Sequence, residues 1–131
     1  MYAFLTLATI IVTAFFLHRA STDQANALRI SAIESVSQEV LKLGRWFADN
    51  PHLRVALALP EATDTADGEA AAVVYADFFD HVLFQEDVYN QVYMKAWRSY
   101  FEDRLRMYPQ IGKFIKAHRS WYGPKLNALV P

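Results

Sequence analysis

The sequence predicts an all-α protein in which a single N-terminal transmembrane helix continues into a small cytoplasmic helical bundle. Three observations support this fold class. Residues 1–17 carry no charged side chain. No proline or glycine occurs before Gly44, so nothing interrupts a helix that leaves the membrane. In the remaining chain apolar residues recur at helical spacing, and no stretch shows the strict alternation of a strand.

The predicted membrane span covers residues 1–18. Its apolar part would be about 25 Å long, slightly less than the roughly 30 Å of bilayer hydrocarbon. No basic residue precedes it and no small-residue cleavage site follows it, which argues against a cleaved signal. A buried helix of a soluble domain is the alternative. Arg19 and Arg29 follow the span, which favours an outside N-terminus and a cytoplasmic C-terminal domain at the inner membrane.

One face of the predicted span is small and polar. Thr6, Thr9 and Thr13 recur at intervals that place them on one side of a helix. Small hydroxyl residues allow two helix backbones to approach closely, so we expect this face to contact another membrane subunit. The alternative is that each threonine bonds to its own helix and faces lipid.

Residues 19–50 are predicted to form an amphipathic connecting helix. Ile33, Val36, Val40, Leu43 and Phe47 repeat with 3-4-3-4 spacing, and polar residues occupy the other faces. This stripe has to be buried against later helices of the chain or against a partner. The first three residues of the stripe are therefore candidate partner-binding residues.

Residues 51–131 are predicted to form one compact helical domain. Asn50 is expected to cap a short helix that starts at Pro51. Residues 60–68 form an acidic loop without bulky apolar side chains, which predicts an exposed and mobile segment. Asp67 is expected to cap the helix that begins near Glu69.

Two aromatic helices are predicted next, over residues 69–84 and 87–108. The second carries Tyr93, Trp97, Phe101 and Leu105 at intervals of four, which is typical of core packing. A further helix starts at Pro109 and ends at Gly123-Pro124, and residues 125–130 add one turn.

Charge is distributed unevenly along the chain. Residues 19–59 carry a net charge of +1, residues 60–94 carry −8 and residues 95–131 carry +6, which sum to −1. A chain without net positive charge or a nucleic-acid motif is not expected to bind nucleic acid. Lys113, Lys116 and Arg119 are candidate partner-binding residues that would contact anionic lipids. The alternative is that they pair with the acidic segment, within the domain or on a neighbour.

Aromatic residues and prolines recur in a characteristic order between residues 69 and 130. The order is Trp97-x-x-Tyr100-Phe101, then Tyr108-Pro109, then Arg119-x-Trp121-Tyr122-x-Pro124, and a closing segment from Leu126 to Val130. This spacing resembles an uncharacterised class of bacterial proteins, which are small helical domains behind one N-terminal transmembrane helix. The resemblance implies an architecture and no chemistry.

Residues with catalytic or metal-binding chemistry are few. Asp77 and His81 lie one helical turn apart with Asp80 between them, a spacing that can hold a metal. A helical metal centre needs a second such helix, and none is present in the sequence. A solvated acidic face explains the same residues. No nucleophile motif or phosphate-binding glycine loop occurs, so we expect neither a cofactor nor an enzyme.

These observations predict a non-catalytic accessory or assembly subunit of a larger membrane protein complex, for which a photosynthetic or respiratory complex is a natural host. The alternative is a membrane-tethered sensor or adaptor that binds a small ligand or a soluble partner. An empty pocket among Phe78, Trp97 and Phe101 would favour the sensor, and a filled core would favour the subunit. An enzyme would require Asp77, Asp80 and His81 to converge with another acidic residue around a metal.

Overall fold

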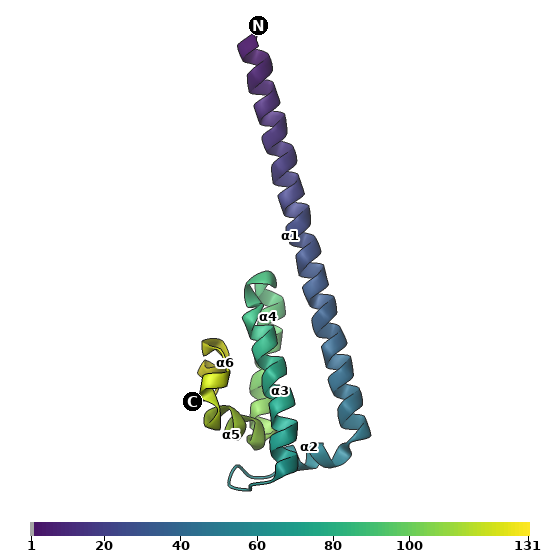
Figure 1. Cartoon of the computed structure of the whole chain (residues 1–131), viewed down its shortest axis with the longest axis vertical. Helices are drawn as coiled ribbons and strands as arrows, with labels where there is room; N and C mark the ends of the chain where they lie inside the picture. Colours follow the sequence, from purple (N-terminus) through teal and green to yellow (C-terminus); the bar gives the residue numbers. More distant parts are fainter. Residues whose placement is uncertain (1) are drawn as a thin grey trace.

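The computed structural model describes the backbone of residues 2–131 and the side chains of residues 8–131. Throughout these residues the regular structure is helical and no strand occurs, which confirms the all-α part of the predicted fold class (Figure 1). The elements in chain order are α1 (Tyr2–Asp49), α2 (Pro51–Leu57), α3 (Ala66–Phe84), the 3-10 turn η1 (Glu86–Val88), α4 (Gln91–Met107), α5 (Pro109–Ala117), the 3-10 turn η2 (Arg119–Trp121) and α6 (Pro124–Leu129).

Helix α1 is one continuous rod of 48 residues. Its N-terminal half projects away from the other helices, and its C-terminal half runs beside them (Figure 1). We call the other helices, α2 to α6, the head. Among the described residues, no helix combines the length and the hydropathy needed to cross a bilayer. The expected span, residues 1–18, starts within residues 1–7, whose side chains lie outside the described part.

The junction between α1 and α2 differs from the prediction in one detail. Pro51 is the first residue of α2, as expected, but the Asn50 side chain does not cap that helix. Its Nδ2 instead donates to the carbonyl of Trp46 at 2.9 Å. The same carbonyl also accepts from the backbone N of Asn50 at 3.0 Å, so the side chain adds a second bond at the last turn of α1.

The starts of α3 and α4 differ from the prediction. Helix α3 begins at Ala66 because Thr65, and not Asp67, caps it through a bond from Gly68 N to Thr65 Oγ1 of 3.0 Å. The predicted helix over residues 87–108 is divided into η1 and α4. Asn90 caps α4 by accepting from Tyr93 N at 2.8 Å.

Helix α3 lies at the centre of the head, with α1 on one side and α5 and α6 on the other (Figure 1). Aromatic side chains of α3 and α4 fill the space between these two helices. Phe79 and Phe101 are completely buried with ring centroids 4.2 Å apart. The stripe of α1 joins the same core, because Phe47 stacks on Tyr75 of α3 at 5.1 Å.

The acidic loop between α2 and α3 is attached to α5 by a buried glutamine. Gln110 Nε2 lies 2.6 Å from the carbonyl of Pro60, 3.0 Å from that of Thr63 and 3.3 Å from that of Leu59. The prediction of a mobile loop did not include this anchor. A buried amide that meets three loop carbonyls restrains a segment whose own side chains are small and polar.

Candidate functional site

The predicted threonine face lies on the projecting half of α1. Thr9 and Thr13 are exposed, and the side chain of Thr6 lies outside the described residues. These two positions are one helical turn apart, so they belong to the same face. The contact with another membrane subunit stays a prediction.

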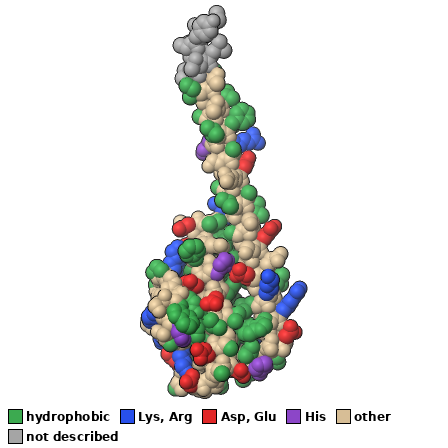
Figure 2. Space-filling model, viewed as in Figure 1, with side chains coloured by type: hydrophobic (Ala, Val, Ile, Leu, Met, Phe, Trp, Pro, Cys, Tyr) green, Lys and Arg blue, Asp and Glu red, His purple; other side chains and the backbone are tan. Residues whose placement is uncertain are grey.

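The same half of α1 carries large apolar side chains that the head does not cover. Figure 2 shows hydrophobic side chains along the projecting neck of the molecule. Their exposed fractions range from 53% to 66%, in the set Ile10, Ile11, Val12, Phe15, Phe16 and Leu17. Apolar packing with the head begins at Ala32, just after Arg29 hydrogen-bonds to η1. An apolar surface of this size without intrachain cover is unusual for a protein that works alone in water.

The other predicted stripe on α1 packs against the chain's own head. Val36 is completely buried, and Ile33 and Val40 are partly buried against the same core. This arrangement is the intrachain alternative for the stripe, because α3 and η1 lie directly beside α1. Val36 therefore has no exposed surface left for a partner.

The predicted basic patch is engaged within the domain as well. Lys113 Nζ donates to the carbonyl of Thr63 at 2.8 Å and lies 3.5 Å from Asp64. Lys116 Nζ lies 3.2 Å from a carboxylate oxygen of Glu61. These contacts link α5 to the acidic loop.

Arg119 makes a different kind of contact, with backbone groups near the C-terminus. Its guanidinium donates to the carbonyl of Val130 at 2.9 Å and to that of Asn127 at 3.3 Å. The three candidate basic residues thus hold parts of the head together. Internal charge compensation, the alternative considered for this segment, describes Lys113 and Lys116 but not Arg119.

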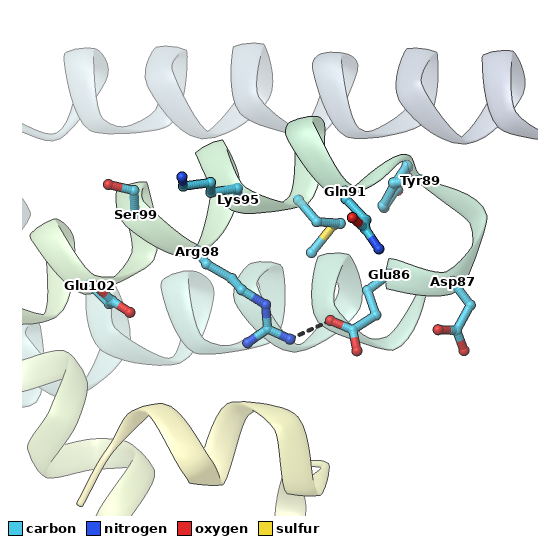
Figure 3. Close-up of a pocket in the computed structure, with 9 residues that line it drawn as sticks. Glu86, Asp87, Tyr89, Gln91, Lys95, Arg98, Ser99 and Glu102 are labelled. Atoms are coloured by element: carbon cyan, nitrogen blue, oxygen red, sulfur yellow. Dashed lines mark hydrogen bonds and ion pairs between the residues drawn. The ribbon is translucent and has the colours of Figure 1, made fainter.

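A cavity of about 750 Å³ lies beside η1 and α4 (Figure 3). Its wall contains an ion-pair network centred on Glu86. This carboxylate pairs with Arg98 of α4 and lies 2.8 Å from Lys125 Nζ. The hydrogen bond from Lys125 is the main reason that the pKa of Glu86 is lowered from its ordinary value. The cavity is lined by Glu86, Asp87, Tyr89, Gln91, Met94, Lys95, Arg98, Ser99 and Glu102.

The structure gives two of the three candidate metal ligands a role in holding the C-terminal segment. Asp77 accepts from the Tyr122 hydroxyl at 3.1 Å, and Asp80 accepts from Gly123 N at 3.0 Å. Burial, and then the charge of Asp77, raises the pKa of Tyr122. His81 Nε2 lies 3.4 Å from Glu39 Oε1 of α1. No group of three potential ligands converges among the described residues, so the convergence required for the enzyme hypothesis is not found there.

The aromatic rings that could have enclosed a ligand contact one another directly. The Phe78 ring lies 5.6 Å from Trp97 and 6.2 Å from Phe101, and Trp97 lies 5.6 Å from Phe101. These are the distances of packed aromatic pairs. The space among the three rings is a filled core, the arrangement expected for a subunit.

Comparison with protein-family models finds no match, and no curated protein or solved structure matches the chain. The resemblance to small membrane-anchored helical domains therefore stays a prediction. What the geometry offers for a functional inference is the contrast between the two halves of α1. One half carries uncovered apolar side chains, and the other is integrated into a head in which Lys113, Lys116 and Lys125 are paired with carboxylates.

Proposed function

We propose that this chain is a non-catalytic accessory or assembly subunit of a larger membrane protein complex. The projecting half of α1 anchors it, and the head is held at a fixed position by the rest of the same helix. The observation that carries the proposal is the uncovered apolar surface around Ile11 and Phe15, each about 60% exposed. The N-terminus lies outside and the head lies in the cytoplasm, the orientation that Arg19 and Arg29 favour.

The energetic reason for an anchor is direct. Removing apolar surface from water stabilises a protein by about 25 cal/mol per Å², and a side chain such as Phe16 leaves this gain unused while it stays exposed. Lipid or a neighbouring helix would cover the surface. The exposed threonines Thr9 and Thr13 lie on this same segment and support contact with a second helix.

A continuous helix also supports a positioning role. The exposed part of α1 between His18 and Leu28 would separate the anchor from the head by about 15 Å at 1.5 Å per residue. The Arg29 side chain donates from Nε to the carbonyl of Val88 at 3.1 Å and so fixes η1 against α1. A rigid connection of this type holds a docking surface at a constant height above the membrane.

The sensor hypothesis in its original form is not proposed. It required an empty space among Phe78, Trp97 and Phe101, and these rings are in contact. Contact of the basic segment with anionic lipid is also not proposed, because Lys113 and Lys116 are already paired with the acidic loop.

Membrane fractionation tests the anchor. The double variant Ile11→Arg, Phe15→Arg places two charges in the proposed span, and each would cost about 2.5–3.5 kcal/mol at the centre of a membrane helix. We expect the wild type to resist alkaline carbonate extraction and the double variant to be extracted. Leu28→Arg with Leu41→Arg is the matched control, because both residues are exposed on α1 outside the span. Extraction of the wild type, or retention of the double variant in the membrane pellet, would contradict the anchor.

A further inference from the structure

A second cavity lies between α1 and α3. Its volume is about 540 Å³, within the usual range for small-molecule sites. Two turns of each helix form it, which corresponds to a length of about 10 Å. This length suits a small molecule better than a partner helix, which needs anchors over more turns. The lining residues are Glu39, Lys42, Leu43, Trp46, Val74, Asp77, Phe78 and His81.

The floor of this groove is apolar and aromatic. Leu43 and Phe78 lie at the edge of the core and are almost fully buried, whereas Trp46 and Val74 are partly exposed. The Trp46 ring packs edge-on against the ring of Phe47, with centroids 4.9 Å apart, and this contact supports its orientation. A flat, apolar ligand would find a rigid indole surface here.

The rim of the groove is polar and carries more negative than positive charge. Glu39 and Asp77 contribute two carboxylates, and Lys42 is the one Lys or Arg among the described lining residues. His81 Nε2 is buried and makes no hydrogen bond within the described residues, although Glu39 Oε1 lies 3.4 Å away. The imidazole of His81 and the carboxylate of Glu39 therefore lie side by side at the rim.

We propose that the α1–α3 groove is a binding site for a small organic cation with an aromatic or apolar body. The body lies on Trp46 and Phe78, and the ammonium group lies between Glu39 and Asp77. His81 Nε2 faces Glu39 Oε1 at 3.4 Å and helps to position that carboxylate at the rim. The indole face adds attraction for a cation. The site does not depend on the anchor, because all lining residues lie outside the projecting half of α1.

Phenethylamine is a suitable first probe, with 2-phenylethanol as the neutral and 3-phenylpropionate as the anionic analogue. The full-length protein in a non-ionic detergent is titrated with each, and the indole N–H signal of Trp46 is followed by NMR after assignment with Trp46→Phe. We expect a saturable shift with phenethylamine. The alcohol should bind at least fivefold more weakly and the acid more weakly still. Equal shifts with all three analogues, or no saturable shift of Trp46, would overturn the proposal.

Charge variants test the rim without removing the floor. Glu39→Gln and Asp77→Asn should each weaken phenethylamine binding by threefold or more, whereas Lys42→Met should strengthen it. Glu34→Gln is the matched control, since Glu34 is exposed on α1 and does not line the groove. Because Lys42→Met is expected to act in the opposite direction, a general loss of folding cannot produce the whole pattern. Unchanged affinity in the three rim variants would contradict recognition of a cation.

Discussion

Lys125 Nζ lies 2.8 Å from Glu86 Oε1, so the last helix of the chain is joined to the turn that precedes α4. The other oxygen of the same carboxylate pairs with Arg98. One acidic residue from the negative segment thus holds two cations from the positive segment. The uneven charge of the sequence is compensated here inside the domain, and three elements depend on one carboxylate.

Glu86→Gln should therefore destabilise the head and flatten its response to acid. The pKa of Glu86 is lowered in the folded protein, so its contribution is fully present above the ordinary value of 4.5 and is lost as the pH falls through the folded value. We expect a loss of about 1 kcal/mol or less at neutral pH, because the network is partly exposed. Urea unfolding at pH 7 and pH 3 measures both effects. Asp103→Asn, in an exposed pair with Arg106, is the control and should change little.

Phe101→Ala should be among the most damaging single changes in the head. The side chain is completely buried, and its ring centroid lies 4.2 Å from that of Phe79. Its removal therefore leaves a cavity between α3 and α4. Truncation of a buried phenylalanine costs about 3–5 kcal/mol. Phe84→Ala is the matched control, because Phe84 is 83% exposed, and its unfolding free energy should stay within about 0.5 kcal/mol of the wild type. Similar losses in the two variants would contradict the described core.

Gln110→Ala should release the acidic loop. The variant removes the bonds from the amide to the carbonyls of Pro60 and Thr63. These carbonyls keep their bonds from Thr63 N and Lys113 Nζ, so the expected loss is about 1 kcal/mol for each hydrogen bond removed. We expect a lower unfolding free energy together with faster proteolysis between residues 58 and 65. Gln38→Ala, at an exposed position on α1, should leave both unchanged. A protease-resistant loop in the first variant would show that Gln110 is not its anchor.

Asp80→Ala should increase the mobility of the C-terminal segment, and this effect should not depend on a bound metal. Its carboxylate accepts from Gly123 N, just before α6 begins. Hydrogen exchange is expected to increase at residues 123–130 and to stay unchanged in α2. Addition of a chelator to the wild type should not reproduce the effect. A chelator that lowers the melting temperature as Asp80→Ala does would instead support a bound metal.

Local patterns predicted much of this fold. The start of α2 at Pro51 and of α5 at Pro109 follows from the fixed backbone angle of proline, which no distant residue alters. The stripe of Tyr93, Trp97, Phe101 and Leu105 likewise indicated which face of α4 packs on the core, because its spacing matches one helix face, although only Phe101 is fully buried.

The contacts between segments were not readable from the sequence. Nothing near Gln110 indicates that its amide meets carbonyls some fifty positions earlier in the chain. The same holds for Lys125 and Glu86, whose charges allowed a partner inside or outside the domain. The cap at Thr65 was missed because Thr65 and Asp67 are both suitable N-cap residues, and tertiary packing selects between them.

Co-purification from gently solubilised membranes tests the central claim most directly. The full-length protein, with a C-terminal tag, is recovered in a mild detergent, and the proteins that accompany it are identified and quantified. A subunit should be recovered in fixed stoichiometry with one defined membrane complex, and this recovery should be lost when Thr6, Thr9 and Thr13 are changed to leucine. Changing Thr22 to leucine is the control, since Thr22 lies on the same helix beyond the proposed span. Recovery of the wild type alone, as a detergent-bound monomer, would contradict the account.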